Sequence, residues 1–359
     1  MNNAYINSVK HISAQQPLWD DWFENPSFYS EPYIRAIEPD YKLFFTPNEV
    51  RRYGKILKRA LLVSRLTMKE SGVLSPDAII TGTGLGCIES TEIFLDKLTR
   101  DGEEFLNPTH FMQSTHNTIG SLIAIDSKCN SYNCTYAHKG ISFECALLDA
   151  FLQLHHKSIV NSKTTRNLLV GAHDEMTPAY YNLLKKTSYL GNPKQTFAGE
   201  TAVAMMLSNK NTDKTLCKIE AVQKIYKGVG AVLKLEDITA IREIKNIDFI
   251  MIGVNGVEEN DKIYFENCAK LFPKIPLLQY KNIFGESYTA SALGVYAAAT
   301  CLRRGTIPDF LMCNSRKQIS NVHDSSQENR SSQFLQSQSK ILCYNHIENK
   351  NHTFILLSK

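Results

Sequence analysis

The stretch NCTYAHKGISFECALLDAFLQLHHK, residues 133–157, places a long apolar helix directly after a tight turn. From Ile141 to Leu154, apolar side chains occupy almost every face of the expected helix. A helix with so little polar surface must be buried on nearly all sides, because water would otherwise contact its apolar groups. The stretch therefore predicts a central helix in a layered fold, with His138 on the turn that leads into it.

The turn at residues 136–140 has the chemistry of an anion-binding site. Free backbone N–H groups and the positive end of the helix dipole stabilise negative charge at such a helix N-terminus. A thiol there would be acidified, and an oxyanion would find hydrogen-bond donors. This chain places the imidazole of His138 there instead, and the same field disfavours the protonated ring. We therefore predict that His138 is largely neutral near neutral pH.

Strands and helices alternate along the rest of the chain. Apolar runs that end in Gly, Asn or Asp turns predict strands; they are DAIITGTGLG (77–86), NLLVGAHDEMTP (167–178), TAVAMMLSN (201–209) and FIMIGVNGVEEND (249–261). Residues 50–72 space apolar side chains three and four apart and end at Gly72, which predicts an amphipathic helix. This alternation predicts an α/β layered fold with a mostly parallel sheet, and the similarity of AIITGTGLG to FIMIGVNG suggests duplication. Residues 314–340, rich in Ser, Gln and Asn, predict an exposed or mobile connection.

The composition argues against several classes of function. The 359 residues are 43% hydrophobic, which is enough for about two domains or for one fold of two similar halves. Lys and Arg total 40 against 36 for Asp and Glu, and they are scattered, so we expect no nucleic-acid partner. No run of about 18 apolar residues occurs and the first residues do not resemble a signal peptide. We therefore expect no membrane span and a cytoplasmic location.

The sequence indicates neither a metal site nor a cofactor. The nine cysteines are widely spaced without a C-x-x-C pair, which is typical of reduced core thiols rather than disulfides or a zinc site. The turn GTGLGC (82–87) lacks the G-x-G-x-x-G spacing and a suitable acidic residue about 20 positions later, so a tight turn is favoured over the alternative of a nucleotide site.

Several short motifs, taken in order, resemble the β-ketoacyl synthases of the thiolase superfamily. TYAHKGIS (135–142) resembles the T-A-C-S-S elbow of that family, with His138 in place of the cysteine. ITGTGLGCIEST, LLVGAHDEMTP and FAGETAVAMML resemble its glycine loop and two of its strands, so that the resemblance spans residues 55–310. It implies an α/β, thiolase-like, five-layered αβαβα fold made of two similar halves, residues 1–210 and 211–359.

The second half carries the most specific matches. YKNIFGESYTASALGVYAAATCLRRGTIPD (280–309) resembles the K-S-x-x-G-H-x-x-G-A-A-G helix and places Lys281 on the motif lysine and Glu286 on the histidine. GVNGVEEND resembles the H-G-T-G-T-x-x-N-D loop and places Gly253 on the other catalytic histidine. The family's glycine-rich turn near the end is replaced by YNHIENKNHTFILL (344–357), so the resemblance is poor there.

The three matched positions lack the family's catalytic side chains. Condensation needs a cysteine to hold an acyl thioester and two histidines that support decarboxylation and stabilise the enolate. Because His138, Gly253 and Glu286 stand there, we do not expect ordinary Claisen condensation. The resemblance instead implies a chain-length-factor-type subunit like those of aryl polyene and flexirubin (dialkylresorcinol) biosynthesis. Its implied partners are a catalytic ketosynthase subunit and an acyl carrier protein.

Two alternatives remain open at this point. One is an active thioesterase or acyltransferase that uses neutral His138 as general base with Glu286 orienting it; the other is a homodimer that binds acyl groups without partners. We expect Lys281 to form an ion pair with Glu286. Cys145, two turns from His138, is a candidate substitute nucleophile whose pKa apolar surroundings should raise. The candidate pocket residues are His116, Tyr136, His138, Lys281, Glu286 and His352.

Overall fold

The computed structural model describes residues 3–104, 106–155, 165–187, 189–191, 195–228, 231–241, 246–313 and 333–359. Its main feature is a ten-stranded sheet in the order β3-β2-β4-β5-β1-β6-β12-β11-β7-β8. The strands of the first part are β1 (Ala4–Ile12), β2 (Ala78–Gly82), β3 (Tyr132–Tyr136), β4 (Asn167–Asp174) and β5 (Thr201–Ser208). Those of the second part are β6 (Cys217–Tyr226), β7 (Phe249–Ile252), β8 (Leu277–Gln279), β11 (Lys340–Ile347) and β12 (Asn351–Ser358).

The two ends of this sheet repeat one topology. In the first, β2 is parallel to β3 and β4, while β5 is antiparallel to its two neighbours, β4 and β1. In the second, β7 is parallel to β8 and β11, while β11, β12 and β6 follow in the same antiparallel manner. The equivalent strands β2 and β7 are the two whose sequences suggested duplication. The expected boundary at residue 210 lies between β5 and β6, and the division into two halves there stays a prediction.

The expectation of a mostly parallel sheet is wrong. Four of the pairings in the large sheet of the described chain are parallel, and the other five, including the β1–β6 pairing that joins the two ends, are antiparallel. Uniformly apolar runs suggested parallel strands, since such strands are usually covered on both faces. Every residue of β5 is buried although its pairings are antiparallel, so its sequence resembles that of a parallel strand.

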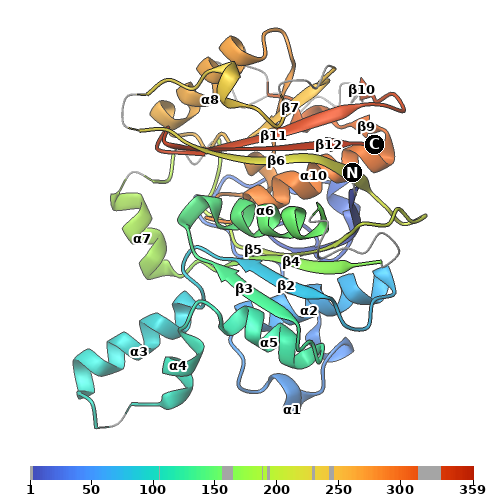
Figure 1. The fold of residues 1–359 in the computed structure, drawn as a ribbon. Helices are drawn as coiled ribbons and strands as arrows, with labels where there is room; N and C mark the ends of the chain where they lie inside the picture. The colour runs from blue at the N-terminus through green and yellow to red at the C-terminus, as the bar shows by residue number, and fades with distance from the viewer. Residues whose placement is uncertain are drawn as a thin grey trace.

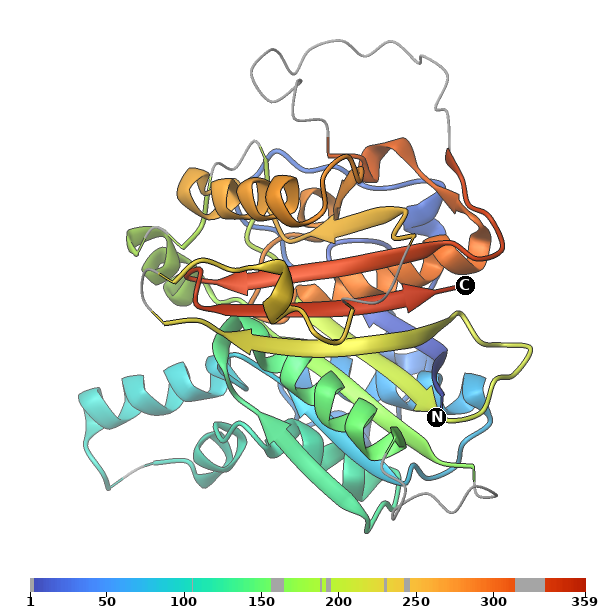
Figure 2. The same ribbon diagram turned by 45° about the horizontal axis from the view of Figure 1, so that its top comes forward.

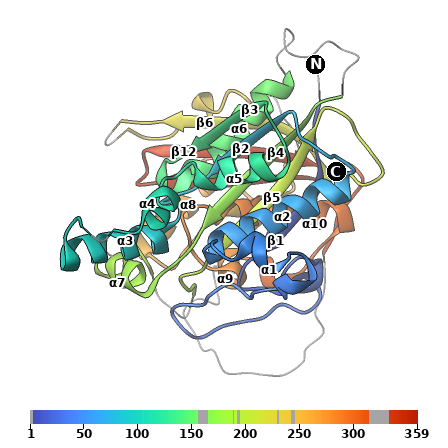
Figure 3. The ribbon, with the colours of Figure 1, turned by 90° about the horizontal axis from the view of Figure 1, so that it is seen from below.

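The fold has five layers, in which layers of helices alternate with the two parts of the sheet, as Figure 1 shows. The central layer holds α6 (Ser142–His155) and α10 (Ser291–Arg304), whose side chains share one apolar core. The strands β1 to β5 form the first part of the sheet. On its outer side lie α2 (Lys55–Ser71) and α5 (Thr118–Asp126), which Figure 3 shows from below. On the outer side of the second lies α8 (Glu258–Leu271). The expected five-layered αβαβα arrangement is confirmed.

The central helix α6 is less completely buried than its sequence predicts. Ala146, Leu147, Ala150 and Leu154 are fully buried, as expected. Leu152 on another face is 56% exposed, and Leu148 is only partly buried. An apolar helix that leaves one face open in a single chain has a surface available for a further partner.

The amphipathic helix predicted for residues 50–72 is confirmed as α2, with a later start. A separate single turn, α1 (Pro47–Val50), precedes it, and the long helix begins at Lys55. It ends where the glycine predicts, because Gly72 adopts a left-handed conformation with φ of 73° and its N–H caps the last turn.

The remaining elements lie around the layers. Helices α3 (Ile88–Asp101) and α4 (Pro108–Gln113) form an arm that extends away from the body, as Figures 1 and 2 show. The other short elements are α7 (Pro178–Lys186), α9 (Lys281–Phe284) and the two-residue strands β9 (Thr306–Ile307) and β10 (Gln333–Phe334). Of the predicted connection at 314–340, residues 314–332 lie outside the described residues, and β10 pairs with β9; the mobility of this segment stays a prediction. Among the described residues no helix is long and apolar enough to cross a membrane.

Candidate functional site

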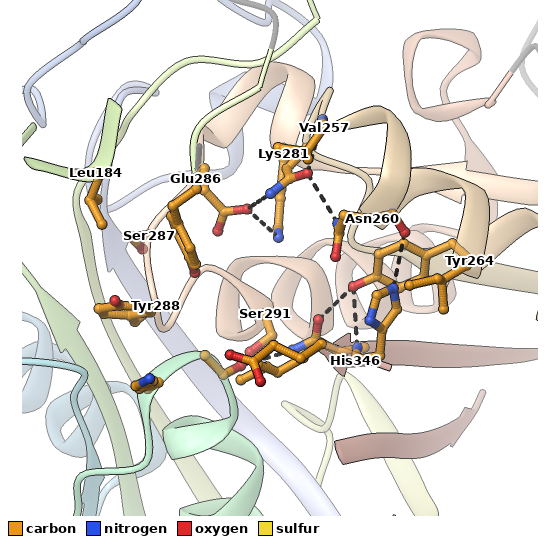
Figure 4. A pocket seen from close by; sticks show the side chains of 18 of the residues that line it. Leu184, Val257, Asn260, Tyr264, Lys281, Glu286, Ser287, Tyr288, Ser291 and His346 are labelled. Carbon is orange, nitrogen blue, oxygen red and sulfur yellow. Dashed lines mark hydrogen bonds and ion pairs between the residues drawn. The ribbon is translucent and has the colours of Figure 1, made fainter. Parts of the chain in front are cut away.

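A cavity of about 600 Å³ lies between the two halves of the fold. Lys139, Gly140 and the end of α7 form its wall on the first half, while the start of α8, the α9 region and the β11–β12 turn form the wall on the second. Figure 4 shows the side chains that converge on it. They include Leu184, Tyr189, Asn255, Asn260, Ile263, Tyr264, Lys281, Glu286, Tyr288, Ser291, Asn345 and His346.

Lys281 and Glu286 line this cavity and neutralise each other. The Lys281 ammonium lies 2.7 Å from Glu286 Oε2, and both side chains are buried. Asn255 Nδ2 donates a second hydrogen bond of 2.9 Å to the same oxygen. The expected ion pair is therefore present, and it holds the carboxylate in one position. Removing one member of such a buried pair would leave an uncompensated charge.

Gly253 directly follows β7, at a point where a side chain has no room. A Cβ atom on Gly253 would lie 2.7 Å from the Tyr264 hydroxyl and 3.2 Å from both Asn345 Oδ1 and the Tyr280 hydroxyl. The Tyr264 hydroxyl is itself fixed, because it donates a 2.7 Å hydrogen bond to Asn345 Oδ1. Tyrosine and asparagine side chains thus fill the space beside the position matched to a catalytic histidine.

Asn345 joins the two halves, and the sequence analysis did not single it out. Its Nδ2 group donates to the Gly140 carbonyl (2.9 Å) and to Glu144 Oε1 (2.7 Å) on the central helix. Burial raises the pKa of Glu144, and the hydrogen bond from Asn345 partly offsets this effect. The signal that could have identified this residue was YNHIEN, where polar side chains replace the glycine-rich turn of the resembled family.

His346, next along β11, is a second residue that the sequence analysis missed. Its Nε2 atom lies 3.1 Å from the Asn260 carbonyl, which can only accept, so Nε2 carries the proton and Nδ1 is an acceptor. Nδ1 is buried and has no hydrogen-bond partner among the described residues. Burial lowers the pKa of His346 to about 3, so the ring is neutral.

His138 lies on the surface and does not line the cavity. Its Nδ1 atom is 3.5 Å from the Lys224 ammonium, which also donates to Cys145 Sγ at 3.7 Å. Burial and then the charges of Lys224 and Lys139 lower the pKa of His138, which agrees in direction with the neutral ring predicted from the helix dipole. The pKa of the Cys145 thiol is raised by burial, as expected.

The other three candidate pocket residues also lie apart from the cavity. Tyr136 on β3 donates a 3.1 Å hydrogen bond to Asp149 on α6. His116 is exposed in the connection between α4 and α5. His352 is buried in β12, with its Nδ1 atom 3.0 Å from the Tyr344 hydroxyl. Of the six candidates, only Lys281 and Glu286 line the cavity in the described part of the chain.

The glycine turn after β2 is explained by close packing against this site. A Cβ atom on Gly84 would lie 2.2 Å from the Tyr288 ring, which forms one wall of the cavity. A Cβ atom on Gly82 would lie 2.7 Å from the backbone at the start of α6. The glycines are therefore required for the packing of a tight turn, and no nucleotide is needed to account for them.

Residues 51–237, more than half of the chain, match the family model described as the β-ketoacyl synthase N-terminal domain. The chain belongs to the β-ketoacyl synthase family. No curated protein sequence matches it.

Solved structures of ketosynthases share this fold. A β-ketoacyl synthase from Burkholderia phymatum STM815 is 14% identical with a TM-score of 0.78, over 100% of both chains. One chain in the structure of the ketosynthase ApeO in complex with its chain length factor ApeC, from Xenorhabdus doucetiae, is 14% identical with a TM-score of 0.76, over 99% of this chain and 98% of that one. One chain in the AntDE:AntF structure, a type II PKS acyl-carrier protein in complex with its ketosynthase, is 11% identical with a TM-score of 0.72, over 99% of both chains. At these identities the similarity shows the fold alone.

The three positions matched to the family's catalytic residues contribute little reactive chemistry to the cavity. His138 does not line the cavity, Gly253 has no side chain, and the Glu286 carboxylate is ion-paired with Lys281. The described cavity therefore offers neither a thiolate nor a pair of imidazoles.

Proposed function

We propose that this protein is a non-condensing, chain-length-factor-type subunit that pairs with an active β-ketoacyl synthase. The observation that carries the proposal is the filled space beside Gly253, together with the locked carboxylate of Glu286. Two imidazoles cannot be assembled around an enolate in this arrangement. The Glu286 carboxylate, which is already paired with Lys281, also has no hydrogen to donate to an enolate. A subunit of this kind contributes structure to a complex while its partner performs the chemistry.

We assign two parts of the surface to contact with the partner. The first is formed by the edge strand β3 and the open face of α6, and we call it the partner face. Among the described residues, β3 has no neighbouring strand on its outer side. Tyr132 and Tyr136 donate hydrogen bonds to Asp149, which fixes β3 beside α6. Exposed Tyr132 and Leu152 add apolar area. Unpaired strand edges and open apolar patches both favour association with another chain.

The arm formed by α3 and α4 supports the same proposal. Phe94 and Phe111 pack on each other across the arm, with ring centroids 5.3 Å apart. The arm extends away from the body (Figure 1), and its apolar side chains Leu95, Phe111 and Met112 are exposed. A projecting arm with apolar side chains gains stability when it packs on a second subunit, because that burial removes apolar area from water.

We further propose that the partners are a catalytic ketosynthase and an acyl carrier protein in the cytoplasm, in aryl polyene or flexirubin-type biosynthesis. The motif resemblance supports this product class. The similar structures that pair a ketosynthase with a chain length factor, or with an acyl-carrier protein, support the type of assembly. A homodimer that forms when the chain is alone remains compatible with the exposed partner face.

The alternative of a thioesterase or acyltransferase needs His138 and Glu286 to act together. The hydrogen bonds of the Glu286 carboxylate go to Lys281 and Asn255 inside the cavity, whereas the His138 ring contacts Lys224 outside it. We therefore do not favour this alternative.

Co-expression with a catalytic ketosynthase from the same organism tests the proposed function. The expected result is that the two chains copurify as a heterodimer by size-exclusion chromatography with light scattering. The heterodimer should elongate carrier-bound chains, while this protein alone should not. A stable homodimer that ignores every such ketosynthase, or unaided elongation by the isolated protein, would reject the proposal.

A further inference from the structure

We propose that the partner subunit places the carboxylate of an Asp or Glu side chain against the Lys224 ammonium when it covers the partner face. This inference rests on the pairing with a ketosynthase proposed above, and it names the chemistry that the ketosynthase presents at one point of the contact.

The Lys224 ammonium lies beside the open face of α6. Lys224 belongs to β6, and its Nζ atom reaches to within 3.7 Å of Cys145 Sγ on the helix. Cys145, Leu148 and Leu152 follow one another at intervals of three and four residues, so they share one face of α6, and each is at least partly exposed. A subunit that covers this face therefore also covers the ammonium.

Lys224 has no carboxylate within ion-pair distance in the described part of the chain. Its two side-chain contacts are the Cys145 thiol, whose pKa is raised by burial, and His138 Nδ1 at 3.5 Å. Burial and then the charges of Lys224 and Lys139 lower the pKa of His138, so the ring adds no charge near neutral pH. Solvent reaches the half-buried ammonium while the face is open, and nothing on α6 or the preceding turn supplies the opposite charge.

Asp149 on the same helix is already engaged. Its carboxylate accepts three hydrogen bonds, from Tyr132, Tyr136 and Gln153. A carboxylate accepts at about four positions, so little of its capacity remains free. In a second copy of this chain, Asp149 would therefore be a poorer partner for Lys224 than a carboxylate without such bonds. This difference favours a different subunit on the partner face.

The cost of desolvation determines what that subunit must supply. Covering the face removes water from the ammonium, and burying an unpaired charge is unfavourable. A neutral donor or acceptor cannot balance the charge, whereas a carboxylate can. Complementary charges of this kind also fix the orientation of two subunits and disfavour wrong partners.

Surface plasmon resonance against an immobilised catalytic ketosynthase from the same organism tests the inference. Lys224→Met keeps the length of the side chain and removes the charge, so we expect binding to weaken at least about tenfold, because the partner's carboxylate is left without its counter-charge. Lys224→Arg should restore most of the affinity. The control is Lys218→Met on the same strand, since Lys218 already pairs with Glu220 at 2.9 Å within this chain.

The outcomes separate this inference from the proposed function. If the wild type binds and Lys224→Met binds equally well or more tightly, the inference fails and the pairing stands. If the wild type binds no such ketosynthase, both fail.

Cross-linking of the purified pair with a water-soluble carbodiimide identifies the carboxylate. This reagent joins an ammonium and a carboxylate in direct contact by an amide bond, and peptide mass spectrometry locates the bond. We expect a link from Lys224 to an Asp or Glu of the ketosynthase, and no such link in Lys224→Arg. A link from Lys224 to a second copy of this chain, or links to the ketosynthase through other lysines alone, would overturn the inference.

Discussion

At the scale of single residues, the positions matched to the family's catalytic groups have acquired structural contacts. Glu286 is paired with Lys281, and His138 contacts Lys224. The sequence was sufficient to anticipate the first of these, because the two residues lie five positions apart in one motif. The sequence could not predict that the His138 ring lies outside the cavity. The direction of a side chain at this turn depends on packing with β6, which is distant in the sequence.

Gly253 provides a prediction at this scale. In Gly253→Ala the new methyl group would lie 2.7 Å from the fixed Tyr264 hydroxyl, so neighbouring side chains must shift. We expect a loss of about 1–3 kcal/mol in the free energy of unfolding, as is typical of overpacked cores. Gly228→Ala is the control, because Gly228 is exposed and nothing lies within 4 Å of its Cβ position. Urea denaturation measures both variants, and equal stabilities would contradict the proposed lack of space.

His173 provides a prediction about pH. It is fully buried in β4, and neither ring nitrogen has a hydrogen-bond partner among the residues that the structure describes; burial lowers its pKa from 6.5 to about 3. Since the unfolded chain binds the proton more readily, His173 reduces stability as pH falls from 6.5 towards 3, by up to about 1.4 kcal/mol per pH unit. We expect His173→Leu to flatten the pH dependence of the free energy of unfolding in this window. Exposed His116→Leu is the control, and parallel curves for His173→Leu and the wild type would contradict the account.

At the scale of elements, apolar runs in the sequence identified β2, β4, β5, β7 and α6, and helical spacing identified α2, but the sequence did not reveal the relative directions of the strands. Buried antiparallel strands such as β5 have the same uniform apolar character as parallel ones. The sequence also did not predict that one face of α6 is open. A helix face that packs on a second chain is as apolar as a helix face that is buried within its own chain. The exposure of Leu152 therefore carries information that the sequence alone does not.

Leu152 provides a prediction at this scale. Leu152→Glu places a charge on the partner face, so we expect the affinity for the ketosynthase to fall at least about tenfold, because an interface charge would have to be desolvated without a partner. Leu74→Glu is the matched control, because Leu74 is an even more exposed leucine in the connection between α2 and β2. Surface plasmon resonance against the immobilised ketosynthase compares them. Equal affinities would place the interface elsewhere.

At the scale of the whole molecule, the chain keeps the five-layered fold of its family with a cavity whose chemistry is altered. The fold class could be predicted because motif order and alternating elements reflect the whole sequence. The cavity could be predicted only in part, since Asn345 and His346 reach it from the last hairpin, where the family resemblance is poor. The central claim is that this protein supports condensation without carrying the growing chain.

Intact-protein mass spectrometry tests that claim most directly. The copurified pair is incubated with acyl and malonyl carrier proteins, and the mass of each subunit is recorded with and without His138→Ala in this chain. The account predicts an acyl adduct on the ketosynthase alone, with the same pattern in the variant. An acyl adduct on this chain that is lost in His138→Ala would contradict it.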